Sequence, residues 1–402
     1  MRVDLLSREY PPEVYGGAGV HLEYLARELR RLADVRVHAF GASRDEPGVT
    51  GYPDLPELAG ANSALRTMGV DLTMVAGCAG TDLVHSHTWY ANFAGHVAKL
   101  LYGVPHVLTS HSLEPLRPWK AEQLGGGYAL SSYLERTSIE HADAVIAVSA
   151  GMRRDILRAY PSVDPGRVHV VHNGIDTTQY APDPDTDVVR RFGIDPDRLS
   201  VVFVGRVTRQ KGLSYLLRAA RSLPAEAQLV LLAGAPDTAE IADEVQALVA
   251  ELRATRDGVV WIPEMLPKPE VVQILTHSTV FVCPSIYEPM GIVNLEAMAC
   301  ETAVVATATG GIPEVVVPEE TGLLVPVEQA SDGTGTPVDP DRFVADLAAA
   351  VTQLLDEPKR AAEMGRAGRQ RAVEEFSWPS IAERTMAVYS LALGAPATPG
   401  AR

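Results

Sequence analysis

The chain has 402 residues, of which 51 are acidic and 35 are lysine or arginine, so its formal net charge at pH 7 is −16. This excess of carboxylates disfavours a general affinity for nucleic acids or acidic membranes. Hydrophobic residues make up 46% and charged residues 21%, which supplies large cores and excludes a disordered chain. Because single cores stop growing near about 250–300 residues, the length predicts more than one domain.

Cysteine usage and the amino-terminal segment set expectations for the compartment. Cys78, Cys283 and Cys300 form neither a CxxC pair nor a disulfide framework, which favours a reducing compartment. The opening apolar run is too short for a signal peptide, and no stretch approaches the ~20 apolar residues of a membrane-spanning helix. We therefore expect a cytoplasmic protein that binds neither nucleic acid nor membrane, as a monomer or a homodimer.

Short apolar runs alternate with helical patterns along nearly the whole chain. The leucines between 22 and 32 recur at helical spacing and predict a helix over residues 21–34. Runs without period-2 alternation are typical of strands covered on both faces, as in parallel sheets. The predicted strands fall into two series: 3–7, 35–40, 82–86, 106–110 and 144–149, then 200–205, 228–233, 259–262, 279–283 and 302–306. These two series predict an α/β fold of two Rossmann-like, doubly wound parallel-sheet domains.

The Pro- and Asp-rich stretch 181–187 separates the two series and is typical of a linker. We expect an amino-terminal Rossmann-like domain over 1–180 and a carboxyl-terminal Rossmann-like domain over 181–376. A helix near 377–393 is expected to pack back on the first domain. Ligands of open α/β sheets bind beyond the carboxyl ends of the strands, so two facing sheets predict one cleft between the domains.

A glycine-rich segment, Tyr15–Gly19, follows the first predicted strand directly before a helix. Glycines let the backbone approach a ligand closely, and a helix N-terminus offers unpaired N–H groups to an anion. The amide of Gly17 is therefore a candidate hydrogen-bond donor to a phosphate. The alternative is a tight strand-to-helix turn without a ligand.

Two cations, Arg206 and Lys211, follow the first strand of the second series. An arginine fork and a lysine point charge at one strand end can converge on a pyrophosphate. The alternative is a solvated basic pair.

Two glutamates, Glu288 and Glu296, flank seven residues after another strand of the second series. Each carboxylate can accept hydrogen bonds from two neighbouring hydroxyls, which suits polyols. Between them, the amides of Gly291, Ile292 and Val293 would open a helix and could hold a phosphate. Glu296 could instead lie on a solvated helix face, but its apolar neighbours disfavour that reading.

Together these motifs resemble those of the retaining glycosyltransferases with two Rossmann domains (GT-B), in the glycogen-synthase and mannosyltransferase group. The resemblance covers nearly the whole chain and implies this fold, with 1–180 as the acceptor domain and 181–376 as the nucleotide-sugar donor domain. The matching segments, in order, are 16–19, 82–87, 109–111, 172–176, 205–212, 288–296, 309–314 and 320–325.

Within that group, the segments 10–12, 15–21 and 116–128 resemble the short actinobacterial-type glycogen synthases. That subgroup also makes α-maltose 1-phosphate from ADP-glucose and glucose 1-phosphate for glycogen and α-glucan synthesis. Larger bacterial glycogen synthases carry Lys-Thr-Gly-Gly-Leu where this chain has Val14–Ala18. This departure favours a small acceptor over direct elongation of a glucan.

The resemblance also implies roles for the donor-binding residues. Arg206 and Lys211 would neutralise the departing nucleotide diphosphate, where charge develops in the transition state. Glu288 would hold hydroxyls of the transferred glucose, and Glu296 the ribose hydroxyls. Gly17 and the amides of 291–293 would add donors.

The resemblance places His111 beside the donor sugar, near its reacting carbon. Of the other residues after strand ends, His87 and Trp89 are acceptor-site candidates, although His85, His87 and Trp89 could equally be core residues.

The acceptor phosphate requires a further cationic contact in the first domain. Our hypothesis for it is Arg117 and Lys120, in the loop that follows His111, because binding groups favour loops. A mobile surface loop is the alternative, and Arg153 with Arg154 is the second choice.

The implied reaction is glucosyl transfer with retention, in which the departing phosphate takes the acceptor's proton. A two-carboxylate hydrolase scheme fits less well, because Glu296 belongs to a nucleotide-binding motif. No His, Cys or Asp cluster has metal-ligand spacing in the sequence, so we expect neither a protein-bound metal nor a cofactor besides the donor. The expected partners are a nucleotide sugar and a sugar phosphate, with an α-glucan as a possible further one.

Four other functions remain open. One is direct elongation of an α-1,4-glucan. Another is a GDP-mannose-dependent lipid mannosyltransferase, which should carry a basic amphipathic helix, whereas helix 21–34 also contains Glu23, Glu28 and Asp34. A nucleotide-sugar epimerase should form product without an acceptor. A non-catalytic binding module should bind ADP-glucose without turnover, and the retained arginine, lysine and glutamates argue against it.

Overall fold

The computed structural model describes residues 1–14, 16–117, 120–330 and 334–394. The chain forms two compact units, which we call the amino-terminal unit (Met1–Gly174 with Trp378–Arg402) and the carboxyl-terminal unit (Ile175–Ser377). In the structure the boundary falls between Gly174 and Ile175, a few residues before the expected one between 180 and 181.

The amino-terminal unit is built on a seven-stranded parallel sheet in the order β3-β2-β1-β4-β5-β6-β7. Every residue of β4, β5 and β6 is buried, which explains why these segments show no polar alternation. The strands are β1 (Arg2–Ser7), β2 (Asp34–Phe40), β3 (Val49–Tyr52), β4 (Leu83–His87), β5 (His106–Ser110), β6 (Ala144–Ala147) and β7 (Val168–Val170).

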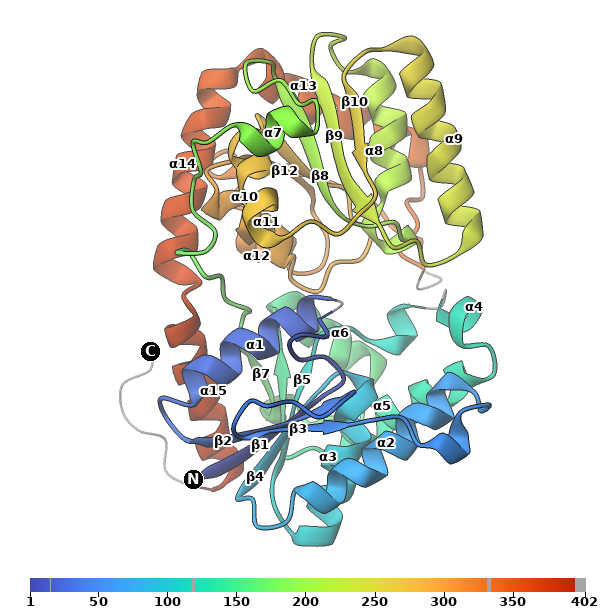
Figure 1. Cartoon of the computed structure of the whole chain (residues 1–402), viewed down its shortest axis with the longest axis vertical. Coiled ribbons are helices and arrows are strands. Elements are labelled where there is room, and N and C mark those ends of the chain that lie inside the picture. The colour runs from blue at the N-terminus through green and yellow to red at the C-terminus, as the bar shows by residue number, and fades with distance from the viewer. Residues whose placement is uncertain (15, 118–119, 331–333, 395–402) are drawn as a thin grey trace. The chain divides into compact units, whose positions relative to one another are not determined.

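Helices cover both faces of this sheet (Figure 1). They are α1 (Gly17–Leu29), α2 (Ser63–Gly77), α3 (Trp89–Tyr102), α4 (Lys120–Leu124), α5 (Gly127–His141), α6 (Ala150–Ala159) and α15 (Trp378–Ala392). The last of these packs into the core that α1 also covers, through Trp378, Ile381 and Tyr389.

The helix predicted over residues 21–34 is α1, and its predicted bounds are wrong. It starts at Gly17 and ends at Leu29, with Arg30 as its C-cap. Leu22, Leu25 and Leu29 are buried, but Leu32 is 47% exposed. The helix stops early because the chain must turn within four residues to begin β2.

The carboxyl-terminal unit is built on a six-stranded parallel sheet in the order β10-β9-β8-β11-β12-β13. Its strands are β8 (Ser200–Arg206), β9 (Gln228–Gly234), β10 (Val259–Ile262), β11 (Val280–Cys283), β12 (Ala303–Thr307) and β13 (Gly322–Val325). Its helices are α7 (Asp187–Arg191), α8 (Leu213–Ala219), α9 (Ala239–Thr255), α10 (Lys268–Thr276), α11 (Ile292–Ala299), α12 (Ile312–Val315), α13 (Pro340–Asp356) and α14 (Pro358–Glu375), and they cover both faces (Figure 1).

The predicted fold class is confirmed, since each unit is a doubly wound α/β domain. Strand order reverses between β1 and β4 in the first sheet and between β8 and β11 in the second. In such sheets the crevice for ligands lies beyond the carboxyl ends of the strands at the reversal. No helix in the described ranges combines the length and apolar character needed to cross a membrane.

Replacing Asp71 by asparagine should change how stability depends on pH. Asp71 lies in α2 and is fully buried, with no hydrogen-bond partner for either carboxylate oxygen among the described residues. Burial raises its pKa well above the ordinary value. The folded state therefore holds the proton more tightly than the unfolded chain. The stabilisation of the folded state by protonated Asp71 is fully present below about pH 4 and is lost as the pH rises.

The asparagine variant has no carboxyl group to titrate at this position. The difference between its free energy of unfolding and that of wild type should therefore increase by up to about 1.4 kcal/mol per pH unit above about pH 4. Urea unfolding at several pH values measures the difference, with Asp45→Asn at an exposed position as control. A difference that does not change with pH would contradict a raised pKa.

Candidate active site

In the carboxyl-terminal unit, the two loops that carry the predicted cations and glutamates follow neighbouring strands. Arg206 is the last residue of β8, and Lys211 ends the short turn after it. Glu288 lies in the loop after β11, which pairs with β8. The backbone N–H of Ile286 donates to the carbonyl of Gln210 at 2.9 Å, which ties the two loops together.

The Glu288 loop is also held by close backbone approaches at two glycines with positive φ. A Cβ on Gly212 (φ +66°) would lie 2.0 Å from the carbonyl oxygen of Pro284. A Cβ on Gly310 (φ +56°) would lie 1.9 Å from the carbonyl oxygen of Glu288. The same oxygen accepts a hydrogen bond from the N–H of Gly311 at 3.0 Å. Only glycine avoids both the clash of a Cβ with these carbonyls and the strain of a positive φ.

The structure brings Lys211 and Glu288 into direct contact. Lys211 Nζ donates to Glu288 Oε2 at 2.6 Å, and Ser285 Oγ donates to the same oxygen at 3.3 Å. Burial lowers the pKa of Lys211, but the charge and hydrogen bond of Glu288 raise it overall. The lysine is therefore charged at neutral pH, and the pair offers a cation to a phosphate beside a hydrogen-bond acceptor for hydroxyls.

Arg206 lies at the same sheet edge and makes an ion pair that the sequence did not predict. Its Nη1 donates to Asp237 Oδ1 at 3.0 Å. Asp237 follows β9, the neighbour of β8 on the other side. The carboxylate holds the guanidinium in place at the strand end.

Glu296 is held by a second residue that sequence reasoning missed. It lies in α11, where Tyr180 Oη donates to its Oε1 at 2.9 Å. Burial raises the pKa of Glu296, and the hydrogen bond from Tyr180 lowers it in part. No sequence signal links Tyr180 to Glu296, because they are far apart in the chain.

The amides predicted to bind phosphate lie at the start of the same helix. Gly291 is the N-cap of α11, with φ +90°, and Ile292 and Val293 are its first residues. Backbone N–H groups in the first turn of a helix have no partner within it. They therefore remain available to an anion.

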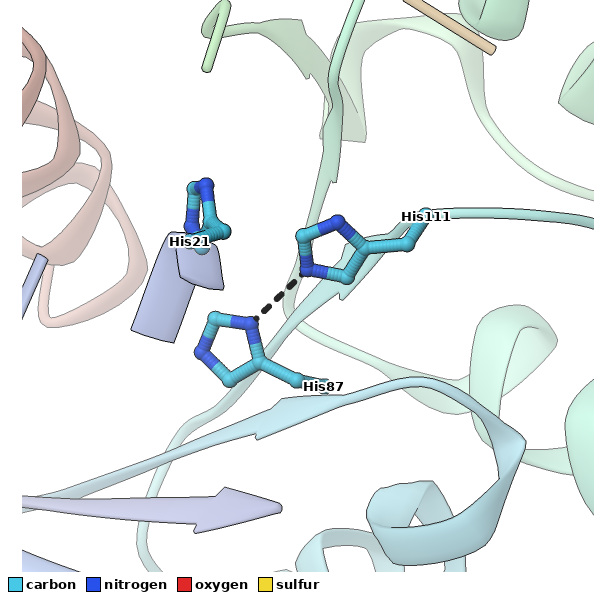
Figure 2. A group of neighbouring side chains, drawn as sticks. All are labelled: His21, His87 and His111. Atoms are coloured by element: carbon cyan, nitrogen blue, oxygen red, sulfur yellow. Dashed lines mark hydrogen bonds between the residues drawn. The ribbon is translucent and has the colours of Figure 1, made fainter. Parts of the chain in front are cut away.

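In the amino-terminal unit, the residues after β1, β4 and β5 lie at neighbouring strand ends. Gly17 opens α1 after β1, His87 ends β4, and His111 directly follows β5. His87 Nδ1 and His111 Nε2 are 3.1 Å apart and share a hydrogen bond (Figure 2). Burial lowers the pKa of both rings well below the ordinary value, with repulsion among the neighbouring histidines adding to it. Both imidazoles are therefore neutral at physiological pH.

Two other candidates in this unit have the contacts of core residues. His85 is fully buried and bonds to Tyr389 Oη at 2.6 Å and Thr109 Oγ1 at 2.8 Å. Trp89 is 2% exposed and stacks on Tyr90 with ring centroids 4.1 Å apart.

The loop proposed for the acceptor phosphate follows His111. Arg117 is partly buried, and its Nη1 donates to Ser112 Oγ at 3.1 Å. Lys120 is the first residue of α4 and is also partly buried. Pro118 and Trp119 between them, like Tyr15 of the glycine-rich segment, lie outside the described residues.

The second-choice pair lies in α6. Arg153 Nε and Nη2 donate to the carbonyls of Val168 and Pro165, each at 3.0 Å, so backbone already engages its guanidinium. Arg154 is exposed.

The carboxyl-terminal unit therefore carries an arginine at a strand end, a lysine–glutamate pair and a second glutamate in the following helix. The chain belongs to the glycosyltransferases: residues 185–371 match the family described as glycosyl transferases group 1, and residues 15–179 match glycosyltransferase family 4.

Among its relatives is the α-maltose-1-phosphate synthase of Mycolicibacterium smegmatis, 58% identical over 97% of this chain and 99% of that protein. The enzyme with the same name from Mycobacterium tuberculosis is 55% identical over the same shares. A D-inositol 3-phosphate glycosyltransferase of Mycobacteroides abscessus is 31% identical over 94% of this chain and 85% of that protein. Among solved structures, a sucrose-phosphate synthase from Thermosynechococcus elongatus matches with a TM-score of 0.78 at 25% identity, covering 98% of this chain and all of that one.

Proposed function

We propose that the chain is an α-maltose-1-phosphate synthase, which transfers glucose from ADP-glucose to glucose 1-phosphate with retention of configuration. The observation that carries the proposal is the full-length similarity, at 58% and 55% identity, to two enzymes of that name. The site residues support it, because a charged lysine, an arginine at a strand end and two glutamates suit a sugar nucleotide.

On the donor side, Arg206 and Lys211 take the diphosphate, and the amides of 291–293 add neutral donors. The phosphate competes with Glu288 for the lysine. Because the lysine stays charged, it stabilises the negative charge that develops as the C1–O bond to the β-phosphate breaks.

Glu288 and Glu296 take the hydroxyls. Glu288 is 7% exposed and fixed by its backbone contacts with Gly310 and Gly311, so its carboxylate needs little reorganisation to receive the glucose. Tyr180 holds Glu296 in the orientation that receives the ribose.

The new bond joins C1 of the transferred glucose to a hydroxyl oxygen of the acceptor, on the same face as the departing phosphate. The hydroxyl proton passes to the departing phosphate oxygen, so ADP leaves and no external base is needed. His111 lies beside the reacting carbon in this scheme. As a neutral imidazole it supplies one hydrogen-bond donor without repelling the developing positive charge on the sugar.

Product analysis tests the proposal. The chain is incubated with ADP-glucose alone, with glucose 1-phosphate, or with glycogen. A phosphorylated disaccharide formed only with glucose 1-phosphate supports the proposal. Elongated glucan as the sole product would replace it with direct elongation, and turnover without an acceptor would indicate an epimerase.

Replacing both Arg117 and Lys120 by alanine should raise the Michaelis constant for glucose 1-phosphate by about 10²-fold or more, since each charged hydrogen bond contributes about 1.5–3 kcal/mol. The Michaelis constant for ADP-glucose should change little. Steady-state kinetics with each substrate varied in turn measures both constants, with Arg158→Ala, at an exposed position of the same unit, as control. An unchanged constant for glucose 1-phosphate removes the two residues from the acceptor site.

A further inference from the structure

Three histidines that are scattered in the sequence meet in the amino-terminal unit: His21, His87 and His111. They come from the first turns of α1, the end of β4 and the residue after β5, and their rings point toward one another (Figure 2). One ring nitrogen of each lies within 4.8 Å of the other two. We propose that these three imidazoles form a binding site for a divalent transition-metal ion such as Zn²⁺.

The spacing of the rings suits a tetrahedral ion. Zn–N bonds of about 2.0–2.1 Å place ligand nitrogens about 3.3 Å apart in a tetrahedral site. His87 Nδ1 and His111 Nε2 are already 3.1 Å apart. The nitrogen of His21 must move in by up to about 1.5 Å, within the reach of a side-chain rotation, to complete the set. Its ring centroid is 5.4 Å from that of His87 and 4.8 Å from that of His111.

The rings are also in the chemical state that metal ligation needs. Histidine binds metals as the neutral imidazole. Burial lowers the pKa of His21 to about 4 and those of His87 and His111 well below the ordinary value. No proton has to be lost to solvent. The proton shared between His87 and His111 moves to an outer ring nitrogen, which leaves one lone pair on each ring.

Part of the hydrogen-bonding capacity of these rings is unused in the described part of the chain. Both ring nitrogens of His21 are buried without a hydrogen-bond partner. The Asn173 side chain influences the pKa of His21 but lies outside hydrogen-bond geometry for either of its ring nitrogens. Buried polar atoms without partners indicate an absent ligand or water.

The ligand set selects among metals and leaves one position open. Three neutral nitrogens without a carboxylate favour Zn²⁺, Co²⁺, Ni²⁺ or Cu²⁺ over Mg²⁺ and Ca²⁺. His21 and His87 are buried, whereas His111 is partly exposed, which provides a route for the ion and a fourth coordination position.

A second group with metal-ligand atoms in reach, Asp4, His38 and Cys78, suits an ion less well. Both carboxylate oxygens of Asp4 accept hydrogen bonds from Arg36, at 2.7 and 2.6 Å. Burial raises the pKa of the Cys78 thiol to about 12, so it does not supply a thiolate at neutral pH. The arginine would have to leave before a cation could bind.

Binding at the histidine site should also affect transfer. A metal on His111 occupies the nitrogen lone pair and fixes the ring, so Zn²⁺ should inhibit the enzyme reversibly. This consequence rests on the proposed function of His111, whereas binding of the ion does not.

The test is the visible absorption of the whole chain titrated with Co²⁺, followed by displacement with Zn²⁺. Wild type should show the intense bands of four-coordinate Co²⁺ at a one-to-one ratio, and His21→Gln should lower the affinity by at least about tenfold, as expected for loss of a ligand. His141→Gln, at an exposed position of the same unit, should bind as wild type does, and Mg²⁺ should not displace the ion.

Zinc X-ray absorption on the wild-type protein needs no variant. It should show imidazole nitrogens at about 2.0–2.1 Å, whereas sulfur at about 2.3 Å would place the ion at a cysteine and overturn the proposal. Equal Co²⁺ affinity of wild type and a folded His21→Gln, or a six-coordinate spectrum, would overturn it as well. None of these readouts depends on transfer activity, so failure of the site and failure of the proposed function are distinguishable.

Discussion

Replacing Lys211 by methionine should lower kcat/KM for glucosyl transfer by about 10²–10³-fold, the usual cost of removing one preorganised donor to developing charge. The side chain keeps its length and loses its charge. Because the pKa of Lys211 is raised, wild type has this charge throughout the neutral range. The loss should therefore be similar at every pH in that range.

The experiment must separate loss of the phosphate contact from disturbance of Glu288, which the lysine also pairs with at 2.6 Å. Binding of ADP, which lacks the sugar, should weaken in Lys211→Met but not in Glu288→Gln. Lys99→Met removes a comparable ion pair, 2.8 Å from Asp143 in the other unit, and should leave kinetics unchanged. If Lys211→Met keeps wild-type ADP affinity and kcat/KM, the lysine does not contact the diphosphate.

Replacing His111 by glutamine should lower kcat by about 10²-fold or more, with a smaller effect on the Michaelis constant for ADP-glucose. The imidazole is proposed to act beside the reacting carbon, where its contact strengthens in the transition state. Its pKa lies well below the ordinary value, so the ring is neutral over the working range. The wild-type pH profile should therefore show no step near the ordinary histidine pKa from this residue.

Pre-steady-state and steady-state kinetics of His111→Gln measure the effect on kcat, and His141→Gln at an exposed position controls for loss of an imidazole. A change confined to the Michaelis constant of either substrate would assign His111 to binding alone. A wild-type step near the ordinary pKa that disappears in the variant would contradict the neutral state.

Much of the fold could be predicted from the sequence, because central parallel strands are buried on both faces and read as continuous apolar runs. β4, β5 and β6 were found in this way. β3, β7 and β13 were missed, since each is short and lies at a sheet edge, where the pattern is weak. The carboxyl-end placement of Arg206 and Glu288 followed from the same reasoning, and the structure brings their two loops together.

The supporting contacts could not be predicted, because they depend on pairings between distant segments. Tyr180 reaches Glu296 across 116 positions, and Asp237 reaches Arg206 from a neighbouring strand end. The histidine cluster was missed for the same reason. A search for metal-ligand spacing within one segment cannot find His21, His87 and His111, which three separate elements bring together.

If Arg206, Lys211, Glu288 and Glu296 receive one sugar nucleotide, a crystal structure of the chain with ADP will show them around it. The diphosphate oxygens should lie within hydrogen-bond distance of the arginine and the lysine, and the ribose hydroxyls should contact Glu296. ADP bound elsewhere on the carboxyl-terminal unit, with none of these four side chains in contact with it, would show that they do not form the donor site.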